Sequence, residues 1–354
     1  MTETDEPREY EVVVVGGGPA GLQTALYTTR LGHDTALVDR GGGRAAMMLD
    51  THNVIGVTED VSGNEFLETA RGQLEDYGTD IHRDFVTDAE RLDDGRFRLV
   101  GNEGAFVAER VVLGVGFNDE RPDPPLPRTG KGLHYCLHCD AYMFVDESVY
   151  VMGHSDSAAY VAMIMLNFTD EVDLLLRGDE PTWSDETDEL VRAHPVDIVE
   201  AEISGMAKRD DGWLESFEFE DGTVREYKGG FAMYGSNYNT TLFEALDVDL
   251  DDDGTVPVDD HGRTSVDGVF AVGDITPGHN QIPVAMGTGA KAGIAIHMDL
   301  RPFPRSTEDI EADGPVTAED VPAISPELMA TAVAHEGHAA GPRSVEDVEA
   351  SADD

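Results

Sequence analysis

The sequence predicts an α/β fold made of two Rossmann-like halves, because one strand–helix–strand pattern occurs twice along the chain. In each copy a short apolar, β-branched run ends at a glycine, an amphipathic helical stretch follows, and a second apolar run closes the pattern. The length of 354 residues also favours two domains over a single core. We therefore expect two three-layer nucleotide-binding domains.

The first pattern lies near the start of the chain. A strand is expected over 10–15, a helix over 19–31 and a second strand over 35–38. The turn between strand and helix fits the dinucleotide fingerprint G-x-G-x-x-G, whose glycines permit a tight turn, close approach of a pyrophosphate and close packing of helix on strand. This turn holds Gly16, Gly18, Pro19, Ala20 and Gly21. Asp39 follows the second strand, where an acidic residue accepts hydrogen bonds from a ribose.

The second pattern lies in the middle of the chain. A strand is expected over 149–152, a helix over 157–168 and a strand over 172–176. The stretch 118–130 is rich in proline and charge and reads as a connection between domains.

The glycine turn of the second pattern is weaker than the first. Gly153 and Ala158 fit a G-x-G-x-x-A variant of the fingerprint, but Ser155 stands where the middle glycine is expected. Its β-carbon hinders close approach of a pyrophosphate, and Asp156 adds a negative charge beside the phosphates. We expect a nucleotide to bind this turn weakly or not at all.

The composition is strongly acidic. Asp and Glu total 72 against 24 Lys and Arg, and the formal net charge is -48. Such a field repels nucleic acids and anionic membranes. Because 40% of the residues are hydrophobic and the acidic ones are spread along the chain, adaptation to a high-salt cytoplasm explains the charge better than disorder. No apolar run could span a membrane, and the acidic start is no secretory signal, so we expect a halophilic cytoplasmic protein.

The two cysteines of the chain are three residues apart. Cys136 and Cys139 have the spacing of a redox pair or of part of a metal site. A structural zinc site needs four ligands, and the nearby His134 and His138 would crowd all four into six residues, so redox chemistry is the better interpretation. The two histidines are expected to be packing or solvent-facing residues. Asp140 follows the pair directly and is the candidate acid/base for proton transfer to its sulfurs.

Over residues 10–300 these motifs resemble, in order, those of the thioredoxin-reductase family. The resemblance rests on the first glycine turn, on the segment 42–56, on the C-x-x-C-D sequence and on the late motif 268–274. Within it, Arg44 replaces a usual glutamine and Asn280 a usual arginine. Beyond the first turn and Asp39, the FAD-binding residues that it implies are Gly43, Arg44, Asn53, Val86, Gly273, Asp274, Gln281 and Ile282.

The resemblance implies a homodimeric FAD enzyme in which the second domain is inserted into the first. It implies an FAD-binding domain over 1–117 and 244–304 and a nicotinamide-binding-like domain with the cysteine pair over 118–243. The stretch 305–354 lies outside the resemblance, and its few large apolar and many acidic residues predict a mostly disordered, acidic tail with one short helix near 326–333. Cys139 would then be the flavin-proximal sulfur and Cys136 the sulfur that attacks the disulfide of thioredoxin or a similar small redox protein.

The electron donor is open at the level of sequence. The family grips the 2′-phosphate of NADPH with a His-Arg-Arg cluster, and here only Arg177 of that cluster is present. With Gly153 and Ser155, Arg177 is a candidate contact for NADPH or NADH. Three alternatives follow: weak use of a nicotinamide, reduction by a carrier such as ferredoxin, or a dithiol oxidase that uses oxygen, against which Asp140 argues. A non-enzymatic redox sensor is the remaining alternative.

Overall fold

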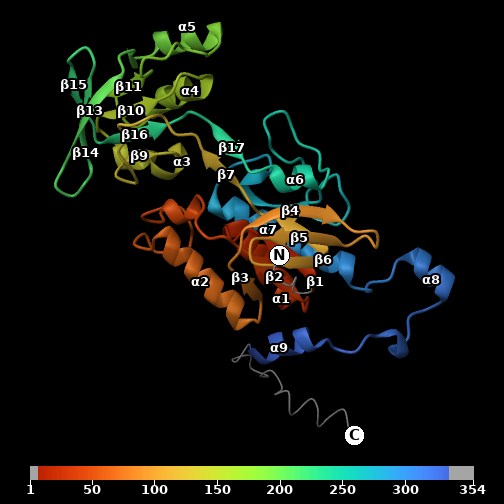
Figure 1. Cartoon of the computed structure of the whole chain (residues 1–354). Coiled ribbons are helices and arrows are strands. Elements are labelled where there is room, and N and C mark those ends of the chain that lie inside the picture. The colour runs from red at the N-terminus through yellow and green to blue at the C-terminus, as the bar shows by residue number, and fades with distance from the viewer. Residues whose placement is uncertain (1–6, 335–354) are drawn as a thin grey trace. The chain divides into compact units, whose positions relative to one another are not determined.

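The computed structural model describes residues 7–334, which form two compact units (Figure 1). The first unit holds the described residues up to Ala46, then Asn64–Phe117, and the described chain from Tyr238 onward. The second unit holds Met47–Gly63 and Asn118–Asn237. The domain boundaries expected from the sequence, with their assignment to FAD and to a nicotinamide, stay predictions.

A seven-stranded sheet forms the centre of the first unit. Its strand order is β3-β2-β1-β6-β5-β4, and β18 also pairs with β6. The strands β1, β2, β3, β6 and β18 pair in parallel, whereas β4 and β5 join antiparallel. Their bounds are β1 (Arg8–Val15), β2 (Thr35–Val38), β3 (Asp80–His82), β4 (Val86–Arg91), β5 (Phe97–Gly101), β6 (Ala105–Leu113) and β18 (Val269–Ala271).

Alternating valines on β1 separate the two cores of this unit. Val12 and Val14 pack on the side of the helices α1 and α7, and Val13 and Val15 pack on the opposite side with β4, β5 and α6. The helical elements are α1 (Pro19–Arg30), η1 (Ala45–Met47), α2 (Gly63–Asp76), α6 (Thr241–Ala245), η3 (Gly273–Ile275) and α7 (Ile282–Leu300). Because Val12–Val15 of β1 and all of β2 and β18 are buried on both faces, these stretches form nearly continuous apolar runs in the sequence.

The described part of the acidic tail contains α8 (Thr307–Asp313), η4 (Ala318–Asp320) and α9 (Pro326–Ala334). Helix α9 occurs where the sequence predicts a short helix, and Thr331 anchors it by donating a hydrogen bond to the backbone carbonyl of Thr29 at 3.2 Å. Most other residues between 305 and 330 are exposed. Residues 335–354, for which disorder is also expected, lie outside the described residues.

The second unit is built on six parallel strands in the order β12-β11-β10-β16-β9-β8. Val149 and Val151 pack against α4 and α5 on one face, and Tyr150 and Met152 pack against the antiparallel sheet β13-β14-β15 on the other, so this unit has three layers. The central-sheet bounds are β8 (Arg128–Thr129), β9 (Gly132–His134), β10 (Val149–Met152), β11 (Val172–Leu175), β12 (Asp197–Val199) and β16 (Gly229–Ala232). The others are α3 (Leu137–Asp140), η2 (Ala141–Phe144), α4 (Asp156–Met165), α5 (Asp185–Ala193), β13 (Ile203–Lys208), β14 (Leu214–Phe219) and β15 (Val224–Glu226).

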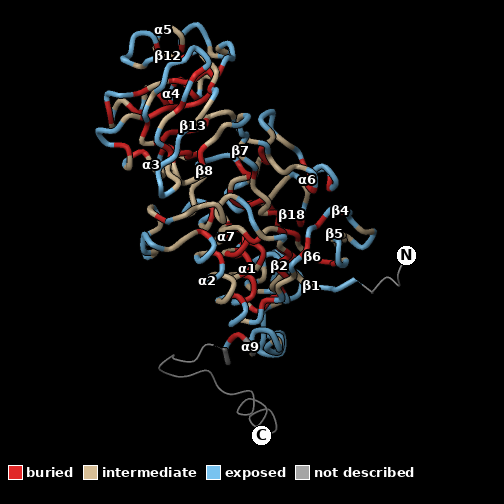
Figure 2. The backbone as a smooth tube through the Cα atoms, turned by 60° about the vertical axis from the view of Figure 1, so that its left-hand side comes forward, coloured by how far each residue is buried: buried red, intermediate tan, exposed pale blue. Residues whose placement is uncertain are grey.

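Two short strands, β7 (Phe117–Asp119) and β17 (Ser236–Tyr238), pair with each other. Figure 2 shows that the buried backbone follows the central strands and the helices packed on them. Among the described helices, none has the length and apolarity needed to cross a lipid bilayer.

The predicted fold class and both strand–helix–strand patterns are confirmed. Strands β2 and β10 have the predicted bounds, and α1 ends one residue early, before Gly32 with its φ of +81°. Helix α4 ends at Met165 instead of residue 168, because the backbone amides of Leu166, Asn167 and Phe168 each bond three residues back, as in a tightening last turn. The sequence pattern did not distinguish this tight turn from regular helix.

Candidate functional site

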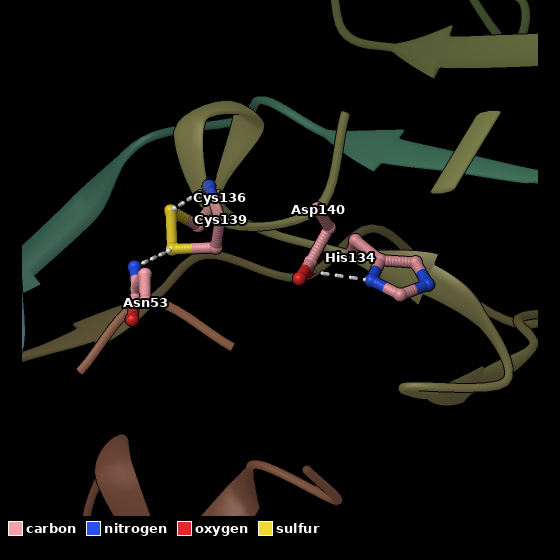
Figure 3. Close-up of a disulfide and its surroundings, with 5 residues drawn as sticks. All are labelled: Asn53, His134, Cys136, Cys139 and Asp140. Atoms are coloured by element: carbon pink, nitrogen blue, oxygen red, sulfur yellow. Dashed lines mark hydrogen bonds and ion pairs between the residues drawn. A yellow bond between two sulfur atoms is a disulfide. The ribbon is translucent and has the colours of Figure 1, made fainter. Parts of the chain in front are cut away.

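The two cysteines form a disulfide at the start of a short helix, with their Cα atoms 5.3 Å apart (Figure 3). Cys136 is the N-cap of α3, and its sulfur accepts a hydrogen bond from the backbone amide of Cys139 at 3.2 Å. The buried Leu137 holds this helix against the core of the second unit. The turn therefore keeps both sulfurs adjacent and gives Cys136 a donor that would stabilise its thiolate.

The amide of Asn53 lies at the disulfide. Its Nδ2 donates to the sulfur of Cys139 at 3.5 Å, as Figure 3 shows. The sequence predicts Asn53 as a flavin contact, and that role stays a prediction. The structure places the residue in the second unit, beside the sulfur for which a flavin-proximal role is expected.

Asp140 ends the same short helix and is bound to a histidine. The Nδ1 atom of His134 lies 2.7 Å from Oδ2 of Asp140, and only 5% of the His134 side chain is exposed. The expectation that His134 is a packing or solvent-facing residue is thus half right, because the ring is packed but also holds the candidate acid/base. His138 is exposed on α3.

In the first unit, the turn between β1 and α1 has the shape that the fingerprint predicts. A β-carbon on Gly16 would meet the carbonyl oxygen of Gly114 at 2.4 Å, and one on Gly21 would meet the carbonyl oxygen of Gly16 at 2.0 Å. The space beside Gly18 is open, with no heavy atom within 4 Å of a β-carbon built there. Pro19 opens α1, and the first turn of this helix contains no acidic residue. The positive end of the helix dipole is therefore uncompensated by its own side chains.

Asp39 sits at the end of β2 against this turn. One of its oxygens accepts the backbone amide of Gly17 at 3.0 Å, and the other pairs with Arg71 at 2.9 Å. Arg71, on α2, has no signal in the sequence that links it to Asp39. The carboxylate is thereby held in place beside the glycine turn.

The late motif 268–274 lies next to the same turn. A β-carbon on Gly273 would meet the β-carbon of Ala20 at 2.7 Å, and the Gly273 amide donates to Thr288 on α7 at 2.9 Å. Packing of α1 on α7, with the Thr24 hydroxyl bonded to the Gly289 carbonyl at 3.1 Å, fixes this arrangement. Three of the other predicted FAD contacts lie close to this motif in the chain: Asp274 is in η3, Gln281 is the N-cap of α7, and Ile282 opens α7. The remaining ones come earlier: Gly43 lies between β2 and η1, and Val86 opens β4. The guanidinium of Arg44 lies 4.9 Å from the centre of the Phe117 ring.

The turn between β10 and α4 carries its own negative charge. Ser155 is the N-cap of α4, and Asp156 opens the helix. One oxygen of Asp156 accepts three hydrogen bonds, from the Ser184 amide at 3.1 Å, the Ser184 hydroxyl at 3.0 Å and the Thr187 hydroxyl at 2.5 Å. The bond from the Thr187 hydroxyl is the main reason that the pKa of Asp156 lies below its ordinary value.

Arg177 is already engaged within the second unit. Its guanidinium donates to one oxygen of Glu202 at 2.8 and 2.9 Å and to the backbone carbonyl of Asp123 at 2.7 Å. Only 4% of its side chain is exposed, and its backbone has a positive φ of +57°. Arg177 is thus held by contacts within the second unit, and its partner Glu202 has no signal in the sequence.

A redox-active disulfide next to a carboxylate, in a chain with two nucleotide-binding types of α/β sheet, defines a disulfide oxidoreductase. The chain belongs to the pyridine nucleotide-disulphide oxidoreductase family, whose model matches residues 10–289. It is a thioredoxin-reductase-like disulfide reductase flavoprotein of that family.

Characterised relatives agree with this placement. A thioredoxin reductase of Peptoclostridium litorale is 30% identical over 80% of this chain and 95% of its own length. A component of the alkyl hydroperoxide reductase of Staphylococcus epidermidis is 28% identical over 83% of this chain and 59% of that protein. The crystal structure of thioredoxin reductase from Streptococcus pyogenes MGAS5005 matches with a TM-score of 0.76 and 26% identity, over 84% of this chain and all of that one.

The family implies two nucleotides, and the two glycine turns fit them differently. The first turn fits the pyrophosphate of FAD, because Gly18 leaves open space and the end of α1 carries no acidic side chain. The second unit does not fit the 2′-phosphate of NADPH, because Arg177 is buried in its pair with Glu202 and Asp156 already occupies the end of α4. Within residues 7–334, no group of three or more His, Cys, Asp or Glu side chains could hold a metal ion.

Proposed function

We propose that this chain is an FAD-dependent reductase that passes electrons through the Cys136–Cys139 disulfide to a disulfide of thioredoxin or a similar small redox protein. The observation that carries the proposal is the disulfide with Asn53 at one sulfur and the carboxylate of Asp140 one residue beyond it in the chain. The relatives include thioredoxin reductases, which supports thioredoxin as the partner.

FAD would be held mainly by the first unit. The backbone around Gly18 would approach the pyrophosphate, Asp39 would accept hydrogen bonds from the ribose, and Gly273 with Asp274 would lie along the ribityl chain. When bound, FAD would supply the electron pair that opens the disulfide. Arg71 keeps Asp39 oriented for this contact.

The cysteine pair would act by thiol–disulfide exchange. After two-electron reduction, the Cys136 thiolate attacks one sulfur of the partner disulfide, and the partner's other sulfur leaves as a thiolate that takes up a proton. The Cys139 thiolate then attacks Cys136 in the mixed disulfide, releases the second partner thiol and restores the intramolecular disulfide. Asp140 would give and take the protons, and the Cys139 amide would stabilise the Cys136 thiolate.

We propose that the donor binds without a phosphate clamp, so that NADPH has no advantage over NADH. The second candidate is a reduced carrier such as ferredoxin, and the charge of Asp156 at the start of α4 favours it. An anaerobic titration in high salt tests both: NADPH, NADH and reduced ferredoxin are added in turn while the flavin absorbance is followed. Bleaching at tenfold lower NADPH than NADH would overturn the proposal. Bleaching by ferredoxin alone would establish the second candidate.

A cysteine variant tests the dithiol mechanism. Cys139→Ser should keep the yellow flavin and lose turnover of oxidised thioredoxin, because the mixed disulfide can no longer be resolved within the enzyme. Turnover that continues in this variant excludes the mechanism. Oxygen consumption without a disulfide acceptor would indicate a dithiol oxidase, and a single change of state without turnover would indicate a redox sensor.

We also propose a homodimer that works in a salt-rich cytoplasm. The family supports the dimer, and the net charge of -48 supports the salt requirement, because screening lowers self-repulsion. Sedimentation in 0.2 M and in molar KCl tests both: a dimer that unfolds or dissociates only at low salt is expected, and a salt-independent monomer would contradict both.

A further inference from the structure

His134 joins the strand before the cysteine pair to the acid/base after it. It is the last residue of β9, and its Nδ1 lies 2.7 Å from the carboxylate of Asp140 (Figure 3). In the chain, His134 precedes the two cysteines and Asp140 follows them. β9 pairs with β8 and with β16, so its backbone is held inside the sheet of the second unit. This contact ties the end of the short helix to a rigid strand.

Aromatic rings fix the orientation of the His134 ring. The ring of Phe144 meets it edge-on with centroids 5.4 Å apart, and those of Phe231 and Trp213 lie at 6.1 and 6.3 Å. The side chain is 5% exposed. A ring packed on three sides in this way presents the same nitrogen to Asp140 at all times.

The surroundings of the second ring nitrogen select one tautomer. His134 Nε2 is buried and finds no hydrogen-bond partner among the described residues. A proton on Nε2 would be a buried donor without an acceptor, which is costly, whereas a bare Nε2 loses less. The ring is therefore neutral with its proton on Nδ1, and Nδ1–H donates to the Asp140 carboxylate.

We propose that His134 is a positioning residue for the proton transfer at the cysteine pair: its contact through Nδ1 aims the carboxylate of Asp140. The proposal rests on the proposed function, because it assigns Asp140 the proton transfer of the disulfide exchange. Each proton that Asp140 takes up from a thiol, as its thiolate forms, is released to a leaving thiolate, while His134 keeps its own proton throughout. His134 itself does not touch the reacting sulfurs in this account.

Other titratable groups act on the same carboxylate. Tyr142 lies within electrostatic reach of Asp140, and burial raises the pKa of its hydroxyl, with the negative charges of Glu59, Asp140 and Asp50 adding to the effect. The Tyr142 hydroxyl is also bonded to His52 at 2.7 Å. These groups are present in every variant below, so a difference between variants reports on His134.

Two substitutions separate the hydrogen bond from the packing. His134→Phe keeps a ring among the three aromatic side chains and removes the donor. His134→Asn loses the ring but can place an amide N–H near the position of Nδ1. His194→Phe is the matched control, because His194 is exposed at the end of α5 and away from β9 in sequence.

The measurement is stopped-flow reoxidation of the dithionite-reduced holoenzyme by 5,5′-dithiobis(2-nitrobenzoic acid) and by oxidised thioredoxin, between pH 5 and 9. In His134→Phe we expect the limb of the pH profile to shift, because the Asp140 carboxylate has lost the donor that orients it. The rate at neutral pH should fall about tenfold. His134→Asn should restore the wild-type limb, and His194→Phe should match wild type.

The outcomes separate this inference from the function on which it rests. If wild-type enzyme passes no electrons to either disulfide, the proposed function fails. If wild type turns over and His134→Phe has the same pH limb, His134 only packs and the inference is overturned. Retained flavin absorbance in His134→Phe shows that the variant has folded. If it has not, the same comparison between His134→Asn and wild type decides: an unchanged limb supports the proposal, and a pH profile like that of Asp140→Asn, which has no carboxylate, opposes it.

Discussion

The glycine turns before α1 and before α4 follow the same chain path and differ in the charge around it. Before α1, the position of the middle glycine is open at Gly18, and the first turn of the helix has no acidic residue. Before α4, the equivalent position is Ser155, and Asp156 follows it with three hydrogen bonds from the start of α5. One turn is shaped for an anion, and the other already contains one.

The difference teaches that the second unit keeps a nucleotide-type fold although an acidic residue opens α4 and Arg177 pairs with Glu202. In the second unit, Asp156 is the first residue of α4, and Glu202 forms an ion pair with Arg177. The carboxylates of Asp156 and Glu202 both bond to neighbouring elements, so they add to the stability of the unit.

The largest effect is expected when Gly18 is changed to serine, the residue at the equivalent position of the second turn. Gly18→Ser has an ordinary φ of -77° and open space for its β-carbon, so the apoprotein should fold normally. FAD binding should weaken by about 4 kcal/mol, close to a factor of 10³, because two hydrogen bonds to a charged phosphate are lost. Fluorescence titration of apoprotein with FAD measures this, and Gly104→Ser, at an exposed glycine between β5 and β6 with open space for a β-carbon, shows what a serine costs elsewhere. An unchanged FAD affinity would mean that the first turn does not hold the pyrophosphate.

The second prediction concerns the arginine. Arg177→Met should lower the free energy of unfolding by about 3 kcal/mol, since it leaves a partly buried Glu202 without its cation. The ratio of flavin reduction rates with NADPH and NADH should stay the same. Urea unfolding and anaerobic stopped-flow reduction measure the two effects. Arg192→Met is the control, because its pair with Asp188 is exposed and worth little. A selective loss of the NADPH rate would show that Arg177 contacts the 2′-phosphate after all.

Gly18 and Arg177 also show how much of the molecule the sequence could predict. The apolar runs and the glycine spacing predicted both strand–helix–strand units, since these signals are local in the chain. Arg177 was predicted as a nucleotide contact, and its partner Glu202 lies 25 residues away at the start of β13. Such a pairing is decided by how strands stack and leaves no periodic signal. The same holds for His134, whose burial depends on Phe231 from a neighbouring strand, and for Asp39 with Arg71 from α2.

The third prediction is that two substitutions in the second turn strengthen its binding of a nucleotide. Ser155→Gly combined with Asp156→Ala removes the β-carbon and the charge from the second turn. NADH binding should then tighten about tenfold, because the end of α4 becomes available to a pyrophosphate. Isothermal titration calorimetry with NADH measures it. Asp185→Ala, which removes an exposed acidic residue from the start of α5, should change little. If the double variant binds no better than that control, features other than this turn limit nucleotide binding.

The smallest expected effect is the stability that Asp156 gives to its own turn. Because its pKa is lowered in the folded chain, chiefly by the Thr187 hydroxyl, the carboxylate stabilises the fold at pH values above its unfolded pKa, and this stabilisation is lost as the pH falls through the folded value. Asp156→Asn should therefore lower the melting temperature at pH 7 by on the order of 1 °C. The difference should shrink as the pH falls below the ordinary aspartate pKa of about 3.9, because the unfolded chain then binds a proton that the folded chain does not. Scanning calorimetry across this range tests it, with Asp210→Asn removing the same charge from an exposed loop. A difference that stays constant down to pH 3 would mean that the shape of Asp156, and not its charge, fills the second turn.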